Sequence, residues 1–239
     1  GLRRDDARPH RGRFGEQDVR ALIAMSGGVD SSVAAYLAQR EGYECIGCTM
    51  KLYTNTDAGI SERHTCCSLD DVEDARAVAY RLGMRYCVFN FSEGFREQVM
   101  LPFCEAYRRA RTPNPCALCN RAMKFGLLFD HAMTLSEAFA TGHYAAVREH
   151  PVYGSALRTG SDGTKDQSYF LALVPVSRLR RCLFPLAEWK KSDIRQWLSS
   201  RGLTPPVHAE SQEICFIPGD DHYAWLKEKA SSEGLKLPG

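Results

Sequence analysis

Ser26-Gly27-Gly28-Val29-Asp30-Ser31 follows directly on the apolar run Val19–Met25, and this junction decides the fold. A buried strand that breaks into a Ser/Gly loop and then into a helix near Ser31 is typical of a phosphate-binding turn. Glycines let backbone N–H groups approach an oxyanion closely, and the helix presents its positive N-terminal end. The spacing is neither the G-x-x-x-x-G-K-[ST] of Walker ATPases nor the G-x-G-x-x-G of dinucleotide folds.

The form SGGxDS is that of the PP-loop, which occurs in enzymes that split ATP into AMP and pyrophosphate. We assign Asp30 to Mg²⁺ or to the geometry of the loop. The hydroxyls of Ser26, Ser31 and Ser32 are expected to meet phosphate. Met50 stands at the end of the second apolar run, where an adenine base lies in nucleotide-binding α/β sheets, although a strand methionine is more often a core residue. A Gly-rich turn without a ligand is the alternative interpretation.

The composition is that of an ordinary globular chain. Its 239 residues are 44% hydrophobic and 25% charged, which allows one substantial core, and the net charge of +2 indicates no partner. Basic residues gather around 108–124 and 178–191, where they either contact phosphates or form solvated helix faces. The apolar runs are too short to cross a bilayer, and the Arg-rich N-terminus has no signal-peptide core. Ten cysteines without a secretory signal favour thiol, metal or catalytic roles and a cytoplasmic protein.

Strand and helix signals alternate through the middle of the chain. Strands are predicted at 21–25, 43–52, 86–91 and 138–141, and helices at 31–40, 68–82, 92–107 and 119–132. This rhythm predicts an α/β fold with a Rossmann-like parallel sheet and helices on both faces. Beyond Tyr144, half of a hairpin at 152–158 and helices at 166–173 and 192–201 predict a small, mostly helical extension. We expect a disordered basic arm at 1–18, a PP-loop domain at 19–217, and the start of an absent or truncated C-terminal region at 218–239.

Two later segments carry cysteines in patterns that indicate chemistry. Thr112-Pro113-Asn114-Pro115-Cys116-Ala117-Leu118-Cys119-Asn120 places a C-x-x-C pair behind two rigid prolines and at a helix N-terminus. That position lowers the pKa of a thiol and suits a nucleophile or a metal ligand. Ser211-Gln212-Glu213-Ile214-Cys215-Phe216-Ile217 brings in a lone cysteine much later.

Together with the PP-loop, these segments resemble the tRNA-specific 2-thiouridylases, the MnmA/TrmU family. Three further stretches join the resemblance, which runs from about Leu22 to about Trp225: Cys66–Ala75, Ala140–Ala145 and Lys165–Leu171. The resemblance implies the PP-loop/HUP type of fold and ATP-driven sulfuration of the wobble uridine of tRNA. The C2 oxygen would be adenylated with release of pyrophosphate, and sulfur would then displace AMP.

The resemblance also implies roles for individual residues. ATP, with Mg²⁺, would be bound by Ala24, Met25, Ser26, Gly27, Gly28, Val29, Asp30, Ser31, Met50 and Gly142. Catalysis would need Asp30, Cys116, Cys119 as nucleophile and Cys215 as the carrier of a persulfide. The tRNA would meet Asn114, Pro115 and Cys116 at its target base, and His143, Lys165, Asp166 and Gln167 elsewhere. A sulfur donor, either sulfide or a persulfide relay protein, is the second implied partner.

One departure from the family pattern concerns Cys116, where better-known members have aspartate. A thiol replaces a carboxylate poorly as acid or base at neutral pH. Three converging thiolates of Cys116, Cys119 and Cys215 would instead seat a 4Fe–4S cluster with one open iron that holds hydrosulfide. A spare Cys116 beside a two-cysteine persulfide route is the alternative, and a zinc site is a lesser one.

The other departure is length, because family members continue into a central domain and a C-terminal β-barrel that grip tRNA. The chain is expected to be either a fragment or a short form. A short form would bind tRNA through its basic clusters, its N-terminal arm, a homo-oligomer or a partner. Two other functions stay open: a non-catalytic ATP-binding or redox-sensing module, and a PP-loop enzyme with a substrate other than tRNA.

Overall fold

The computed structural model describes residues 19–53, 69–200, 214–217 and 221–232. Several predicted features lie outside these residues: the arm 1–18, the Cys66-Cys67 pair, the Ser68 cap, residues 211–213 and most of 218–239 apart from one helix. None of the helices within the described ranges combines the length and the apolar character that a membrane span requires.

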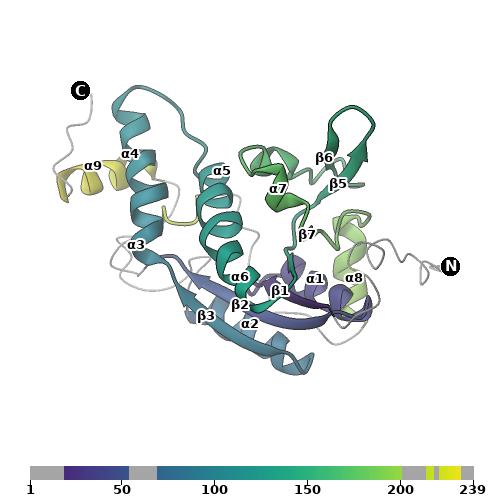
Figure 1. The fold of residues 1–239 in the computed structure, drawn as a ribbon. Coiled ribbons are helices and arrows are strands. Elements are labelled where there is room, and N and C mark those ends of the chain that lie inside the picture. The colour runs from purple at the N-terminus through teal and green to yellow at the C-terminus, as the bar shows by residue number, and fades with distance from the viewer. Residues whose placement is uncertain (1–18, 54–68, 201–213, 218–220, 233–239) are drawn as a thin grey trace.

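A five-stranded, entirely parallel sheet forms the centre of the structure (Figure 1). Its strands, in the spatial order β3-β2-β1-β4-β7, are β1 (Arg20–Ala24), β2 (Glu44–Lys51), β3 (Arg85–Asn90), β4 (Ala138–Ala140) and β7 (Cys182–Leu183). The chain builds outward from β1 to β3 and then returns to build from β4 to β7 on the other side. The carboxyl ends of β1 and β4 therefore meet at a switch point, where open α/β sheets bind their ligands.

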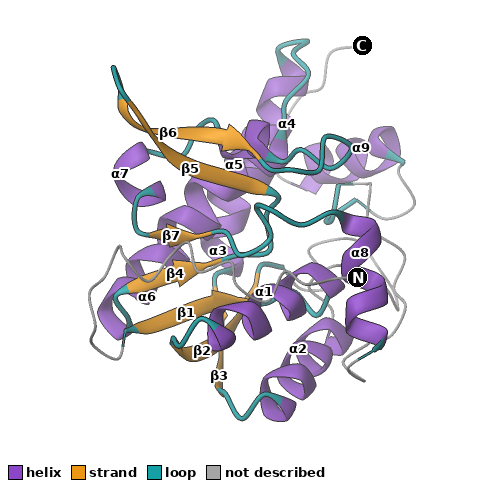
Figure 2. Ribbon diagram, turned by 90° about the vertical axis from the view of Figure 1, so that its right-hand side faces the viewer, coloured by secondary structure: helices purple, strands orange, loops and turns teal. Residues whose placement is uncertain are grey.

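Alternate residues of β1 enter two different cores, because successive side chains of a strand face opposite sides of the sheet. Ala21 and Ile23 pack with α1 (Val29–Arg40) and α2 (Leu69–Arg81), whereas Leu22 packs on the other face. Helices cover both faces of the sheet (Figure 2), which confirms the predicted fold class.

The second face is covered by two long helical stretches rich in aromatic residues. The first consists of α3 (Ser92–Phe95), the π-helix η2 (Arg96–Met100) and α4 (Leu101–Arg108). The second consists of α5 (Pro115–Cys119), the π-helix η3 (Asn120–Leu128) and α6 (Phe129–Leu135). Phe103 is fully buried and contacts Trp225 of α9 (His222–Ser232) edge to face, with ring centroids 5.9 Å apart.

The extension beyond β4 contains more than helices. β5 (Ala145–His150) and β6 (Gly154–Thr159) form an antiparallel hairpin, followed by the 3-10 helix η4 (Ser168–Leu171) and by α7 (Val176–Leu179). Most of its regular structure is helical, as predicted, but the sequence indicated only the return strand of the hairpin. The helix α8 (Lys191–Ser199) then packs on α1 through Ile194 and Leu198.

Two helices begin earlier than their serines predicted. α1 begins at Val29 rather than Ser31, because Gly28 takes the cap position in an extended conformation. α8 begins at Lys191 rather than Ser192, and the side chain of its N-cap residue, Lys190, makes no capping hydrogen bond. A serine in the first turn is compatible with a helix that has already begun, so the sequence places such starts only to within a few residues.

Candidate functional site

The loop after β1 is folded around the carbonyl group of Gly28. Ser31 Oγ and Ser32 Oγ both donate to this carbonyl, each at 3.0 Å. The first hydrogen bond of α1 runs from the Ser32 N–H to the same oxygen at 3.2 Å. The N–H groups of residues 29–31 therefore stay outside the helical ladder and are available to an anion at the N-terminus of a twelve-residue helix.

The serine hydroxyls of the loop serve its own geometry. Ser31 is 5% and Ser32 1% exposed, and the Ser31 oxygen also accepts from the Ser26 N–H at 3.1 Å. The Ser26 hydroxyl lies 3.4 Å from the same oxygen. The expectation that Ser31 and Ser32 offer hydroxyls to phosphate does not match this arrangement, because both hydroxyl protons are committed to Gly28. Backbone N–H groups are the donors that remain.

Glycine is required at two points of the cradle. Gly27 has φ +75°, and a Cβ there would lie 2.7 Å from the carbonyl oxygen of Asp71 in α2. Gly142 follows β4, and its Cβ would lie 2.9 Å from both the carbonyl carbon of Asp30 and the nitrogen of Ser31. The segments after β1 and β4 therefore touch backbone to backbone at the switch point, with no side chain between them.

The other residues assigned to ATP line the approach to this point. Ala24 ends β1, and the Met25 N–H donates to the Cys48 carbonyl at 2.8 Å. Met50 lies near the carboxyl end of β2, is only 9% exposed, and belongs to the aromatic-rich core. Met50 therefore packs as a core residue, although it lies at the carboxyl edge of the sheet, where the adenine base of ATP is expected.

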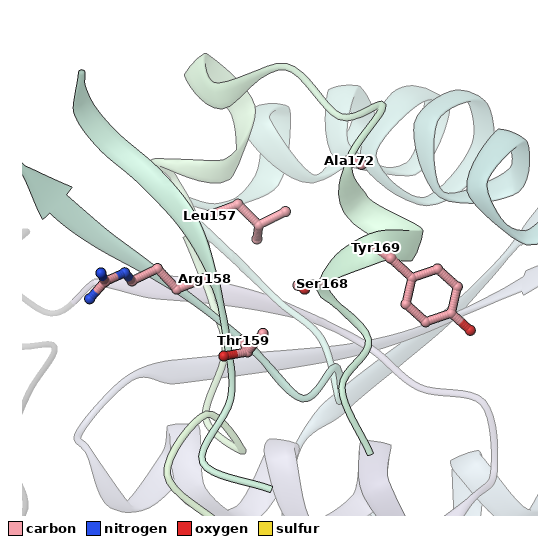
Figure 3. A pocket seen from close by; sticks show the side chains of 6 residues that line it. All are labelled: Leu157, Arg158, Thr159, Ser168, Tyr169 and Ala172. Carbon is pink, nitrogen blue, oxygen red and sulfur yellow. The ribbon is translucent and has the colours of Figure 1, made fainter. Parts of the chain in front are cut away.

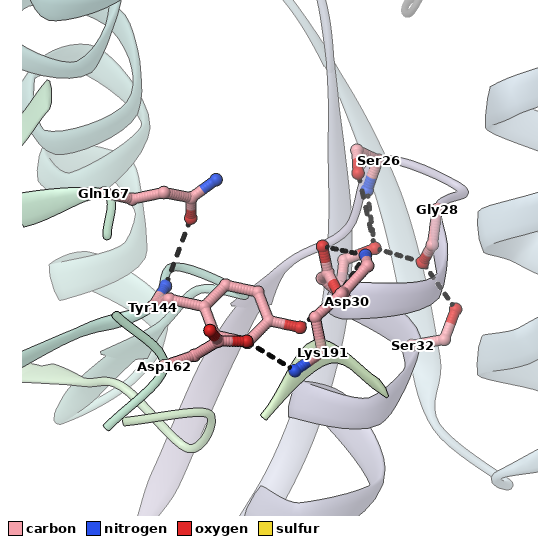
Figure 4. A network of polar contacts seen from close by, with 9 residues as sticks. Ser26, Gly28, Asp30, Ser32, Tyr144, Asp162, Gln167 and Lys191 are labelled. Carbon is pink, nitrogen blue, oxygen red and sulfur yellow. Dashed lines mark hydrogen bonds and ion pairs between the residues drawn. The ribbon is translucent and has the colours of Figure 1, made fainter. Parts of the chain in front are cut away.

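Asp30 of the loop is held by two residues from distant parts of the chain (Figure 4). Lys191 Nζ lies 2.7 Å from each carboxylate oxygen, and the Tyr144 hydroxyl donates to Oδ1 at 2.8 Å. The side chain of Lys191 is 12% exposed and that of Asp30 is 29% exposed. A charge-assisted pair this sheltered from water orients the carboxylate strongly.

A second layer of hydrogen bonds fixes Tyr144 and Lys191. Gln167 Oε1 accepts from the Tyr144 N–H at 3.1 Å, and Asp162 Oδ2 accepts from the Lys191 N–H at 2.8 Å. Asp162 is 7% exposed, and its pKa is lowered by the N–H of Lys191 and by the hydroxyl and N–H of Thr164. An ionised Asp162 therefore anchors the start of α8 beside the loop.

The C-x-x-C segment begins a helix that is capped by its own neighbour. Asn114 Oδ1 accepts from the Ala117 N–H at 3.0 Å, and Pro115 takes the first helical position, where no N–H is needed. α5 thus begins at Pro115, not at the predicted Cys119. Cys116 lies in its first turn, and Cys119 is its last residue.

Cys119 does not have the activated thiol that its position was expected to give. Burial raises the pKa of Cys119 to about 11, the Lys124 ammonium opposes this shift, and the Cys116 thiol adds to it. The expectation of a lowered pKa is wrong here, because burial of the Cys119 thiol outweighs the helix N-terminus, which acts only within the first turn of the helical stretch.

Alkylation by iodoacetamide should report this raised pKa directly. The rate at Cys119, followed by peptide mass spectrometry, should rise about tenfold per pH unit up to about pH 11, because only the thiolate reacts. Lys124→Gln should slow the reaction at any fixed pH by removing the opposing charge, while the exposed Arg121→Gln on the same helix should not. A rate that levels off at pH 8–9 would contradict the raised pKa.

Cys215 lies against the same aromatic-rich core as Cys119. Its carbonyl accepts a short hydrogen bond from the hydroxyl of Tyr53, which follows β2, and Phe216 beside it is 1% exposed. This contact brings the late cysteine segment to the carboxyl edge of the sheet. Cys116, Cys119 and Cys215 are all partly exposed and free of disulfides.

The three cysteines do not form the ligand set of a metal site in this structure. Within the described ranges, which include all three, no group of three or more His, Cys, Asp or Glu side chains is placed to hold a metal ion. A 4Fe–4S cluster or a structural zinc ion needs such a group, so the residues as placed do not fit either one.

The residues assigned to tRNA are only partly surface groups. His143 is 7% exposed, its Nδ1 lies 2.8 Å from Thr141 Oγ1, and burial, aided by Lys124, holds its pKa well below the usual range. It is a neutral core histidine here. Asp166 accepts from the N–H and hydroxyl of Ser168 at the start of η4. Lys165 and Gln167 flank it in the same segment.

An open pocket of ≈ 590 Å³ lies between β6 and η4 (Figure 3). It is lined by Leu157, Arg158, Thr159, Ser168, Tyr169 and Ala172. Tyr169 is 54% exposed and pairs with Phe170 at a centroid distance of 3.9 Å. The helix η4, which carries Tyr169, packs against α5, which carries Cys116. The pKa of Tyr169 is raised by desolvation and by the charges of Cys116 and Asp166.

Three residues of the site were missed as functional by sequence reasoning: Tyr144, Asp162 and Lys191. Lys191 was noticed only as a member of a basic cluster at a helix start, and Tyr144 only as part of a family-like stretch. Neither signal indicates that the two side chains meet Asp30. That contact exists because α8 packs on α1 and Asp162 binds the first N–H of α8.

Comparisons with known proteins show which sequences this chain resembles. The tRNA-specific 2-thiouridylase MnmA of Nitratidesulfovibrio vulgaris is 44% identical over 218 residues, which cover 91% of this chain and 59% of that protein. The MnmA of Magnetococcus marinus is 43% identical over 224 residues, covering 93% of this chain and 62% of that protein. The chain thus spans about three-fifths of the length of these relatives.

A solved NMN synthetase from Francisella tularensis superimposes with a TM-score of 0.50 at 12% identity, over 93% of this chain and 80% of that one, which supports the fold alone. The family model described as tRNA methyl transferase HUP domain matches residues 19–219, from just before β1 to beyond Cys215. The chain therefore belongs to the tRNA methyl transferase HUP domain family.

Proposed function

We propose that this chain carries the ATP-dependent step and the sulfur transfer of a tRNA uridine 2-sulfurtransferase. The observation that carries the proposal is the backbone cradle at the switch point, where Gly27, Gly28 and Gly142 surround the free N–H groups of α1. Such a cradle fits the phosphates of ATP. Cysteines on the same carboxyl side of the sheet fit a transfer of sulfur to the adenylated uridine.

Adenylation would proceed by attack of the uridine C2 oxygen on the α-phosphorus of ATP. The new O–P bond replaces the bond to the β-phosphate oxygen, and pyrophosphate leaves. Mg²⁺ prefers carboxylate and phosphate oxygens, so Asp30 is the residue that would share it with ATP. The N–H groups of residues 29–31 would stabilise the charge of the departing phosphates.

Sulfur transfer would use two of the cysteines. A persulfide relay protein would first pass its outer, sulfane sulfur to the Cys215 thiolate and keep its own cysteine as a thiol. The outer sulfur of the Cys215 persulfide then attacks C2, the C2–O bond breaks, and AMP leaves with the oxygen. The Cys119 thiolate then attacks the inner sulfur, which frees 2-thiouridine and leaves a Cys119–Cys215 disulfide that an external thiol must reduce. Because Cys119 is protonated in the resting state, tRNA binding must bring the deprotonation about.

The persulfide route is favoured over the iron–sulfur route by the placement of the cysteines. It requires two thiols and no three-ligand site, and the described residues present no such site. Measuring the iron and acid-labile sulfide content of anaerobically purified protein distinguishes the persulfide route from the iron–sulfur route. Less than one iron per ten chains in sulfur-transferring protein supports the persulfide route, whereas about four per chain requires the cluster.

The decisive experiment follows 2-thiouridine by nucleoside mass spectrometry. Anaerobic protein is incubated with unmodified tRNA, ATP, Mg²⁺ and either sulfide or a sulfane-sulfur donor such as a cysteine persulfide, and each component is left out in turn. Product that depends on both tRNA and ATP supports the proposal. ATP binding with neither pyrophosphate release nor product would favour a non-catalytic ATP-binding module, and pyrophosphate release with a different nucleophile would favour a substrate other than tRNA.

The pocket beside Cys116 is the surface where the RNA should contact the chain. An exposed tyrosine and an arginine on its rim suit a stacked base and a phosphate. Tyr169→Ala should weaken tRNA binding roughly tenfold in a fluorescence anisotropy titration at fixed salt, since base stacking is worth about 1–3 kcal/mol. Tyr80→Ala, which removes an 84% exposed tyrosine of α2, is the matched control. Equal tRNA affinities of the two variants would exclude the pocket from RNA binding.

A further inference from the structure

We propose that Lys191 is a ligand of the β- and γ-phosphates of ATP, and that Asp30 holds it in reserve until nucleotide and Mg²⁺ arrive. The inference rests on the proposed ATP binding and goes beyond it. It assigns a role to a residue forty-nine positions after Gly142 in the sequence, at the first turn of α8.

The contact geometry defines the resting state. Lys191 Nζ sits 2.7 Å from both oxygens of Asp30, so the ammonium occupies the side of the carboxylate where a cation binds (Figure 4). The Tyr144 hydroxyl takes a further position on Oδ1 at 2.8 Å. A divalent cation that comes with ATP competes for these same oxygens, because it is the stronger partner for a carboxylate once phosphate shares it.

The Lys191 ammonium stays close to the loop when the Asp30 carboxylate binds Mg²⁺ instead. Its backbone is anchored through the Lys191 N–H to Asp162, and α8 is packed on α1 through Ile194 and Leu198. Asp30 itself lies in the first turn of α1, directly beside the free N–H groups of the loop. A lysine released from Asp30 therefore remains within reach of any phosphate bound by those groups.

The charges of ATP and Mg²⁺ favour the transfer of Lys191 from Asp30 to the phosphates. ATP brings several negative charges to a loop whose own acidic residue is already neutralised, and Mg²⁺ offsets only part of them. Transfer of Lys191 from Asp30 to phosphate gives each anionic group a cation: Asp30 shares Mg²⁺ with the nucleotide, and Lys191 pairs with the terminal phosphates. Among the ion pairs of the described residues, the Asp30–Lys191 pair is the one that involves the loop.

Isothermal titration calorimetry with ATP and with AMP, each with Mg²⁺, tests the assignment. Lys191→Gln should weaken ATP binding at least tenfold and leave AMP binding within twofold, because AMP lacks the phosphates that Lys191 would meet. Lys190→Gln is the matched control, since it removes the same charge one residue earlier from an exposed side chain. It should leave both affinities unchanged.

A purely structural lysine predicts a different pattern. Lys191→Gln would then lower the melting temperature but bind Mg²⁺–ATP as well as the wild type or more tightly, because the metal would no longer compete with an ammonium. Equal loss of ATP and AMP affinity would likewise overturn the proposal, since it would reflect a distorted loop. Absence of ATP binding by the wild-type chain would instead refute the proposed function itself.

Asp30→Asn supplies a second line that does not depend on the stability of the lysine variant. It frees Lys191 at the start, so ATP binding in EDTA should persist at wild-type strength or better while the gain from adding Mg²⁺ is lost. The double variant Asp30→Asn with Lys191→Gln should lose the metal-free binding as well. Persistence of metal-free ATP binding in the double variant would show that Lys191 does not contact phosphate.

Discussion

Cys215→Ser should form no detectable 2-thiouridine while binding ATP with wild-type affinity. Oxygen cannot carry a transferable sulfane sulfur, so the persulfide route loses its carrier and the expected loss of rate is at least about a thousandfold. ATP binding should persist because the Cys215 segment meets the sheet through the Tyr53 contact and its core residues, not through the loop after β1. The readout is tRNA-dependent 2-thiouridine by mass spectrometry, beside calorimetric ATP binding.

Cys119→Ser should also form no free 2-thiouridine, but it should leave tRNA covalently attached to the protein. The Cys215 persulfide can still attack C2 of the adenylated uridine, but without the Cys119 thiolate the disulfide that joins the RNA to Cys215 is not cleaved. Pyrophosphate release should therefore continue for one turnover, and one covalent protein–RNA adduct should accumulate. Cys87→Ser in β3 is the matched control, because that partly exposed thiol lies outside the proposed chemistry. Thiolation that survives either Cys119→Ser or Cys215→Ser would refute the assigned sulfur route.

Gly27→Ala should abolish ATP binding under conditions where the wild type is half saturated, a loss of about a hundredfold or more. The added Cβ would lie 2.7 Å from the Asp71 carbonyl oxygen, and at φ +75° the alanine also strains the backbone. Either the loop or the start of α2 must move. A displacement near 1 Å at a binding cradle is enough to cost this much affinity.

Gly83→Ala separates the strain from the clash. Gly83 has φ +65° but no heavy atom within 4 Å of its added Cβ, so only the left-handed backbone is penalised, by about 1–2 kcal/mol. Chemical denaturation should show this destabilisation, whereas ATP binding should be unchanged. If Gly27→Ala also kept its ATP affinity, the loop would not be the phosphate cradle.

Local sequence was sufficient for the parts of the site that lie within one segment. The apolar run before Ser26 predicted β1, and the Ser/Gly loop predicted the turn into α1. The cap of α5 by Asn114 is equally local, although the helix was predicted to begin four residues later, at Cys119. Each of these features depends on residues a few positions apart, whose backbone preferences and short-range hydrogen bonds act in the same way in many folds. The alternation of strands and helices predicted the parallel sheet for the same reason.

The protonation states of the site residues were out of reach of the sequence. Cys119 was expected to be activated and has a raised pKa, and His143 was expected to contact tRNA and is buried and neutral. Both outcomes follow from burial beneath side chains that come from other segments. A pattern of residue types carries no measure of how much water a given atom will lose.

The sequence by itself determined the strand–loop–helix unit and the family, and it singled out the cysteines that the proposed chemistry uses. Only the tertiary structure decided that Gly142 touches the start of α1, that Lys191 and Tyr144 share Asp30, and that the three cysteines do not gather as metal ligands. These contacts join residues more than a hundred positions apart. They are fixed by how the helices pack on the sheet, and packing depends on all of the core side chains at once.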